Sequence, residues 1–238
     1  MTLRANARIA GLAFLLNFVT GIGRAVLWSQ VSAGNGTALK LANIAQHATL
    51  VRATALLVLL EFLYQAVLAV TLYALTRDED RDLALLGAGC RLTEGVIAAI
   101  ATGGRLDLLA AATMSLTATG ADAAAARALG AQLLAGSPGP AALCFALSNL
   151  IFASLFLRAR SIPAWLAGLG VVASILCLVE VALQMLGVLN GIAALVPWIP
   201  MALFEVILAP WLLIKGVTAR SGREAAAPYA TPSGSLSG

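Results

Sequence analysis

Histidine, cysteine and charge are all scarce in this chain. Its 238 residues include one histidine, three cysteines and only 11% charged side chains. A single histidine, His47, cannot ligate a haem from both sides, and the chain contains no H-E-x-x-H, G-x-S-x-G or phosphate-loop pattern. The three cysteines show no metal-ligand spacing and are too few for a disulfide framework. We therefore expect no metal, no cofactor and no catalytic residue of these familiar kinds.

Apolar residues, in contrast, are abundant. They make up 61% of the chain, whereas a soluble domain has about 45–50%, and the mean hydropathy is +0.93. They are gathered in long runs separated by short polar stretches, which is typical of repeated membrane crossings. A net charge of +4 is too small to indicate nucleic-acid binding. The composition therefore predicts an all-α, polytopic membrane protein.

The apolar runs predict a six-transmembrane-helix bundle. Arg24 interrupts the first run shortly before a weak cleavage-like site, so we interpret this run as a retained helix and not as a signal peptide. The predicted spans cover residues 9–28, 49–76, 83–103, 141–157, 164–189 and 195–217.

Two stretches between spans differ from the rest. Residues 32–47 are rich in Gly, Asn and Ser and are interpreted as a link. After Gly103-Gly104 the helical pattern falters at Arg105 and Asp107, and the Ala-rich residues 121–136 follow. We expect a short extracytoplasmic helical insert here, between the third and fourth spans. Residues 1–219 then form one transmembrane domain, and the Ser/Pro/Ala/Gly-rich residues 220–238 form a disordered cytoplasmic tail.

The placement of Lys and Arg predicts the orientation, because cytoplasmic flanks of membrane spans are enriched in these residues. Nine flanking residues lie on the side of the N-terminus: Arg4, Arg8, Arg77, Arg81, Arg158, Arg160, Lys215, Arg220 and Arg223. Three lie on the opposite side: Lys40, Arg105 and Arg127. We therefore expect a multi-pass protein of the cell inner (plasma) membrane with both termini in the cytoplasm.

Charged and amide side chains lie inside the predicted spans. Arg91 and Glu94 are three residues apart near the middle of the third span, so they share a helix face and can pair. A charge at this depth costs roughly 2.5–3.5 kcal/mol on insertion scales, so it normally faces protein or water. Helix rise places glutamates of four different spans in one layer. The predicted buried polar cluster comprises Asn17, Arg24, Glu61, Gln65, Arg91, Glu94, Glu180, Gln184 and Glu205.

Three interpretations of this cluster stay open from the sequence. The charges can simply pair helices in a structural bundle. Alternatively, four glutamates facing two well-placed arginines leave a surplus carboxyl group, which takes up a proton in a low dielectric. The protein would then bind a small solute or relay protons, as a transporter or sensor. The third interpretation is an intramembrane lipid-modifying enzyme, which the scarcity of His and Cys beside acids disfavours.

These interpretations predict the lipid bilayer as a partner, together with a small solute, a lipid or a proton. Nucleic acid is not expected as a partner, and a homo-oligomer stays open.

Three stretches of the chain are similar to a family pattern: the opening of the first span, the turn before the fifth span and the end of the sixth. In order they are Arg8–Leu12 with Phe14–Leu16 and Thr20–Ile22; Ser161–Gly170; and Glu205 with Trp211–Val217. They resemble an uncharacterised bacterial multi-pass membrane protein family, the domain of unknown function 4386. The likeness covers about residues 5–219. It implies a six-span bacterial membrane protein and brings no known activity.

Overall fold

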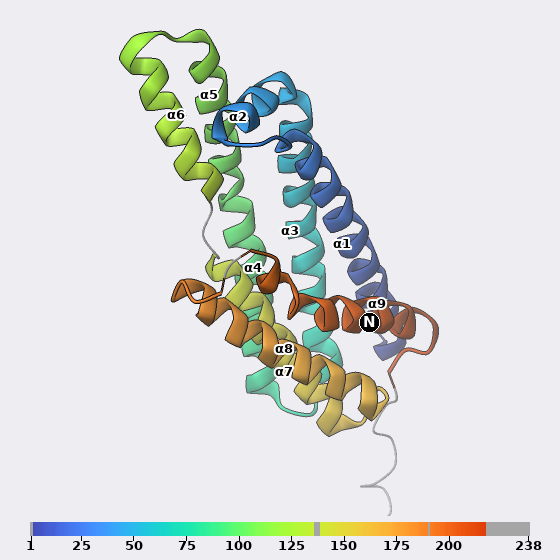
Figure 1. The fold of residues 1–238 in the computed structure, drawn as a ribbon. Helices are drawn as coiled ribbons and strands as arrows, with labels where there is room; N and C mark the ends of the chain where they lie inside the picture. The colour runs from blue at the N-terminus through green and yellow to red at the C-terminus, as the bar shows by residue number, and fades with distance from the viewer. Residues whose placement is uncertain (1, 136–138, 190, 218–238) are drawn as a thin grey trace, which may run out of the picture.

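The structure, a computed structural model, describes residues 2–135, 139–189 and 191–217. The predicted tail, 220–238, lies outside these residues. Every regular element in the described ranges is helical (Figure 1). The elements are α1 (Leu3–Val31), α2 (Thr37–Gln46), α3 (Ala48–Thr76), α4 (Arg81–Ile100), α5 (Thr102–Thr117), α6 (Gly120–Ala135), α7 (Pro140–Ala159), α8 (Ala164–Met185), the short 3-10 helix η1 (Gly191–Leu195) and α9 (Trp198–Ile214).

Six helical segments among the described residues are long and apolar enough to cross a membrane. They contain α1, α3, α4 with α5, α6 with α7, α8, and η1 with α9. The predicted all-α class with six spans is thereby confirmed. Many large apolar side chains on these helices are exposed, for example Leu56 at 66% and Val70 at 69%. Such a surface suits a lipid environment, because lipid tails solvate exposed apolar side chains.

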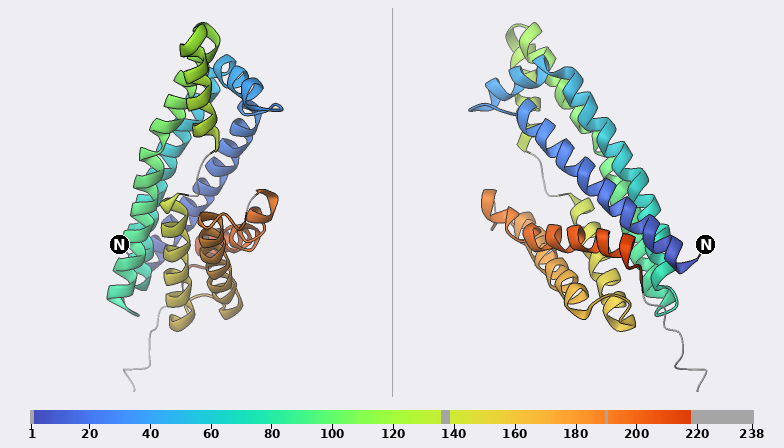
Figure 2. Two further views of the ribbon diagram at one scale, coloured as in Figure 1. Left: turned by 60° about the vertical axis from the view of Figure 1, so that its left-hand side comes forward. Right: turned by 90° about the vertical axis from the view of Figure 1, so that its right-hand side faces the viewer.

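The spanning helices close into a ring in which each one packs against the next. The order around the ring is α1, α3, α4, α7, α8, α9 and back to α1. The long helices α1, α3 and α4 with α5 run through the whole height, whereas α7, α8 and α9 lie beside one half of it (Figures 1 and 2). The main hydrophobic core fills this half of the ring, and its aromatic members are Phe14, Phe152, Phe156 and Phe204.

Small residues set the distance between helices in this ring. A Cβ atom added to Gly11 of α1 would lie 2.6 Å from the carbonyl oxygen of Ala209 and 2.8 Å from the amide nitrogen of Leu213, both on α9. A Cβ added to Gly170 of α8 would lie 2.6 Å from the ring of Phe204. Close backbone approach at small residues is how membrane helices gain van der Waals contact without a hydrophobic driving force. The α1–α9 crossing therefore depends on Gly11.

A second, smaller core lies at the end of the molecule away from α7, α8 and α9, where α2, α5 and α6 gather (Figure 1). Residues 32–47, predicted as a link, contain the helix α2. Its Leu41 and Ile44 are buried against Val31, Leu108 and partly buried residues of α6. This packing explains the helix, since a ten-residue segment is marginal in isolation.

The interruption between α4 and α5 is smaller than predicted. The helix breaks only at Ala101 and continues through Arg105 and Asp107. Helix α8 is shorter than the predicted fifth span, and the sixth segment, Ala193–Ile214, begins two residues before the predicted span and ends three residues before that span ends. α8 ends at Met185, shortly before Gly187 takes a positive φ of 72°, and α9 starts at Trp198, directly after Pro197. Pro residues favour helix starts because their φ is already helical.

Both described chain ends lie at the same end of the ring. A Cβ atom on Gly216, just after α9, would lie 3.9 Å from the Cβ of Ala7 in the first turns of α1. The α3–α4 and α7–α8 turns share this end (Figure 1). They are joined by an ion pair in which Arg158 Nη1 lies 3.8 Å from Asp80 Oδ2.

We expect Gly11→Ala to lower the thermal unfolding temperature in detergent, because the added methyl group forces α1 away from α9. Gly23→Ala is the matched control on the same helix, since a Cβ there meets nothing within 4 Å. That control should be neutral or slightly stabilising, because Ala favours helix over Gly by about 0.5–1 kcal/mol. Equal melting temperatures for the two variants would contradict the close crossing.

Candidate functional site

Arg91 of α4 is the largest fully buried side chain of the described residues, with 1% of its surface exposed. Its Nη1 lies 3.2 Å from Oε2 of Glu94, three residues along the same helix. Its Nη2 donates a hydrogen bond of 3.0 Å to Oδ1 of Asn149 on α7 and lies 3.9 Å from Oε1 of Glu205 on α9. One guanidinium group thus faces two carboxylates from different helices.

Neutral groups complete this environment. Nε2 of Gln65 on α3 donates a hydrogen bond of 2.8 Å to Oε1 of Glu94. The guanidinium carbon of Arg91 lies 5.6 Å from the ring centre of Phe14 on α1 and 5.1 Å from that of Phe145 on α7, a cation–π geometry. We call Arg91, Glu94, Glu205, Gln65 and Asn149 the Arg91 cluster. With the two rings it joins five of the six ring helices.

The local sequence explains why Arg91 can be buried here. Gly87, Arg91 and Gly95 follow at steps of four and therefore share one face of α4. A Cβ added to Gly95 would lie 3.0 Å from the Cβ of Gln65, and one added to Gly87 would lie 3.0 Å from Ile151. The two glycines thus let α3 and α7 approach above and below the arginine. Ser148 Oγ also donates to the carbonyl oxygen of Gly87 at 2.9 Å.

Several polar atoms of the Arg91 cluster are buried without a hydrogen-bond partner among the described residues. They are Nε of Arg91, Oε1 of Glu205 and Oε1 of Gln65. An unsatisfied buried polar group costs about 1–3 kcal/mol, and more when charged. The cluster therefore gains from a further donor, and a proton on a carboxyl group is the smallest one available.

A second polar group lies between α1 and α3, beyond Phe14 on α1 and before Gln65 on α3. Nε of Arg24 is 2.9 Å from Oε1 of Glu61, and both side chains are only partly buried, at 31% and 15% exposure. Gly21, one turn earlier on α1, leaves room for this carboxylate. Asn17 lies about one turn before Gly21 on the same face of α1, and its Oδ1 is buried without a hydrogen-bond partner in the described part of the chain. Arg24 of α1 thus pairs with α3 and is not part of the Arg91 cluster.

The third polar group belongs to α8 and α9. Glu180 is buried, accepts a hydrogen bond from Gln184 on the same helix, and accepts one of 3.0 Å from Nε1 of Trp198. These contacts satisfy Glu180 with neutral donors. The predicted single layer of four carboxylates is therefore divided: Glu94 and Glu205 contact Arg91, Glu61 contacts Arg24, and Glu180 contacts neither arginine.

Sequence reasoning missed several residues that complete these groups. Asn149 is the only amide side chain in the predicted fourth span, residues 141–157, and that rarity is the available signal. The roles of Phe14, Phe145 and Trp198 had no signal, because an aromatic residue in a membrane span is ordinarily part of the apolar surface or core.

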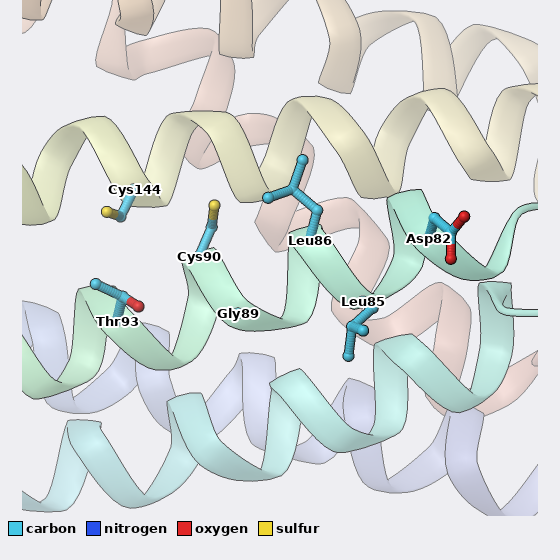
Figure 3. Close-up of a pocket in the computed structure, with 7 residues that line it drawn as sticks. All are labelled: Asp82, Leu85, Leu86, Gly89, Cys90, Thr93 and Cys144. Atoms are coloured by element: carbon cyan, nitrogen blue, oxygen red, sulfur yellow. The ribbon is translucent and has the colours of Figure 1, made fainter.

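The described surface also has a pocket of about 510 Å³ between α4 and α7. It is lined by Asp82, Leu85, Leu86, Gly89, Cys90, Thr93 and Cys144, and none of the predicted cluster residues is among them (Figure 3). Its α4 residues lie on the exposed face, away from Arg91. The three cysteines are free thiols, and no group of three or more His, Cys, Asp or Glu side chains in the described ranges could hold a metal. The polar clusters and this pocket are thus separate features.

We expect Arg91→Met to destabilise the protein by about 3–5 kcal/mol, because it leaves two carboxylates facing each other without a cation. The triple variant Arg91→Met/Glu94→Gln/Glu205→Gln should recover most of this loss, since it removes the charges as a unit. Unfolding free energies in mixed micelles measure both, with Arg127→Met as control, because the Arg127 side chain bonds only a backbone carbonyl of its own helix. Additive losses in the triple variant would argue against the coupling.

Comparison with known proteins gives one result. No curated protein and no solved structure matches the chain. A family model described as a domain of unknown function (DUF4386) matches residues 9–216, which include the Arg91 cluster, most of the first spanning segment and all of the other five. The chain belongs to this DUF4386 family.

Proposed function

We propose that the Arg91 cluster binds and releases a proton, in a membrane protein that couples this event to a small solute as a transporter or sensor. The observation that carries the proposal is the unequal charge count around one buried guanidinium. Arg91 supplies one positive charge, whereas Glu94 and Glu205 supply two negative charges. The other contacts of the cluster are neutral amides and phenyl rings.

A net negative charge in a low-dielectric interior is costly unless it is compensated. Protonation of one carboxyl group removes this cost, and the two carboxyl groups then titrate as a coupled pair around the arginine. A bound cation would compensate the charge equally well. A proton is favoured because Arg91 already lies 3.2 Å from one carboxylate and 3.9 Å from the other, and a second cation there would be repelled by its charge.

Glu205 is the better candidate for carrying the proton. Glu94 is held by both Arg91 at 3.2 Å and Gln65 at 2.8 Å, and these donors favour its charged form. Glu205 has only a neutral amide donor, Asn149, and its Oε1 lies 3.9 Å from Arg91, beyond hydrogen-bond distance, and is buried without a hydrogen-bond partner among the described residues. A proton on Glu205 would weaken the attraction between α9 and α4.

Helix α9 can transmit such a change. Pro210 lies inside it, and proline removes one backbone hydrogen bond and weakens the helix at that point. The neighbouring Ala209 contacts Gly11 of α1 at the close crossing. Charge at Glu205 is therefore linked through about one turn of helix to the α1–α9 contact, which would serve as the moving element of a transporter or sensor.

We expect Glu205→Gln to abolish proton release from the cluster, because an amide cannot titrate. Difference infrared spectroscopy in proteoliposomes should show a carboxyl band that responds to pH in the unaltered protein and is lost in this variant. Asp122→Asn, at an exposed position of α6, is the control and should keep the band.

The structural interpretation predicts a different result. If the unaltered protein shows no titrating carboxyl band inside the membrane, or if the band persists in both Glu205→Gln and Glu94→Gln, the cluster does not titrate and Arg91 only pairs helices. Flux of protons or solutes into the same proteoliposomes then separates a transporter from a sensor, since a sensor would titrate without flux.

We further propose that residues 1–219 form the membrane domain, placed in the cell inner (plasma) membrane with both termini in the cytoplasm. The excess of Lys and Arg on the side of the N-terminus supports this orientation. The shared location of both described chain ends and the two turns supports an even number of crossings (Figure 1).

Cysteine labelling tests the orientation. Asp78→Cys, in the exposed turn after α3, should react with an impermeant maleimide only after the cells are opened. Thr119→Cys, in the exposed turn between α5 and α6, should react in intact spheroplasts. The reverse pattern would place the termini outside.

A further inference from the structure

A pair of arginines lies at the other end of the ring and is not part of the Arg91 cluster. Arg105 of α5 stacks on Trp28 of α1, with its guanidinium carbon 5.6 Å from the ring centre. Arg24 and Glu61 lie close enough to Arg105 to act on its charge. Arg105 therefore joins the Arg24–Glu61 ion pair in one group of three charged side chains, formed by α1, α3 and α5.

The two arginines of this group lie at the level of a lipid headgroup, whereas Glu61, 15 residues before Thr76 and thus about 22 Å along α3, lies deeper. Arg105 is 24 residues beyond Arg81, the first residue of α4, and thus about 36 Å along the helices at 1.5 Å per residue. Arg24 is 21 residues beyond Leu3, or about 32 Å along α1. The hydrocarbon core of a bilayer is about 30 Å thick, so both arginines reach the far interface. Trp28, one turn beyond Arg24, is the residue type enriched at that interface.

The group has a surplus positive charge and an unused donor. Two arginines face one carboxylate, which leaves a net charge of +1. Nη1 of Arg105 is buried without a hydrogen-bond partner among the described residues. Arg24 uses its Nε for Glu61, and its side chain is 31% exposed. An anion would accept a hydrogen bond from the unpaired Nη1 of Arg105 and would neutralise the surplus positive charge.

We propose that Arg24 and Arg105 together bind the phosphate of an anionic phospholipid, in a site between α1, α3 and α5 with Trp28 as its wall. Guanidinium groups bind phosphate oxygens with paired hydrogen bonds. A phosphodiester carries one negative charge and neutralises the group, whereas free phosphate carries between one and two.

Native mass spectrometry of the delipidated full chain tests this site. Phosphatidylglycerol is added to the unaltered protein, to Arg105→Gln and to Arg127→Gln, and bound lipid is counted. Arg127 is the matched control because it belongs to the same helical insert but already bonds the carbonyl oxygen of Ala123 at 3.1 Å. We expect Arg105→Gln to lose at least about tenfold in affinity, as for one charged hydrogen bond, and Arg127→Gln to bind as the unaltered protein.

Three results would overturn the proposal. Equal binding by Arg105→Gln and the unaltered protein would show that the arginine does not hold the lipid. Equal loss in Arg127→Gln would show general charge attraction. Displacement of the lipid by inorganic phosphate, lost in Arg105→Gln, would assign the site to a free anion and not to a phospholipid.

Folding is checked by the melting temperature of each variant. If Arg105→Gln does not fold, the double variant Arg24→Gln/Glu61→Gln removes the other arginine together with its ion-pair partner and keeps Arg105. The same loss of phosphatidylglycerol is then expected, and retained binding would contradict the two-arginine site. Arg105→Gln and Arg127→Gln leave every residue of the Arg91 cluster in place, so proton titration by that cluster can be measured in the same variants and the two proposals fail independently.

Discussion

A positive charge enclosed by membrane helices is the constraint on which this structure depends. Arg91 cannot reach water, so its guanidinium must be satisfied by side chains from the surrounding helices. Two carboxylates, one amide and two aromatic rings do so, and they come from α1, α4, α7 and α9. Each contact fixes the rotation of a helix about its axis. Arg91 thus fixes how the helices of the ring are rotated relative to one another. In lipid, burial of apolar surface contributes little to this, because the lipid tails are as apolar as the helix surfaces.

The two groups of charged side chains carry net charges of opposite sign. The Arg91 cluster has more carboxylates than arginines, and the group of Arg24, Glu61 and Arg105 has more arginines than carboxylates. An imbalance of negative charge favours uptake of a proton, and an imbalance of positive charge favours an anion. Helices α1 and α3 connect the two groups, since α1 carries Phe14 and Arg24, and α3 carries Gln65 and Glu61. Rotation of either helix would alter both.

Glycine and proline make part of this ring able to move. Gly11 brings α1 against the backbone of α9, where a larger residue would clash, and Pro210 interrupts the hydrogen bonds of α9 at the same crossing. Glu205 lies on α9 shortly before this point. In contrast, Glu180 accepts hydrogen bonds from two neutral donors, Gln184 and Trp198, which hold it in place. The part of the molecule suited to respond to a proton is therefore α9 with α1.

The amino-acid sequence alone determined the all-α class, the six apolar spans and the presence of buried charge, because these follow from local composition and from the cost of a charge in lipid. Pairing of Arg91 with Glu94 also followed from their spacing. Only the tertiary structure decided that Glu205 joins Arg91 while Glu61 and Glu180 do not, and that Arg105 lies near Arg24. Such partners depend on the tilt and rotation of each helix, which are set by distant contacts such as those of Gly11 and Gly95.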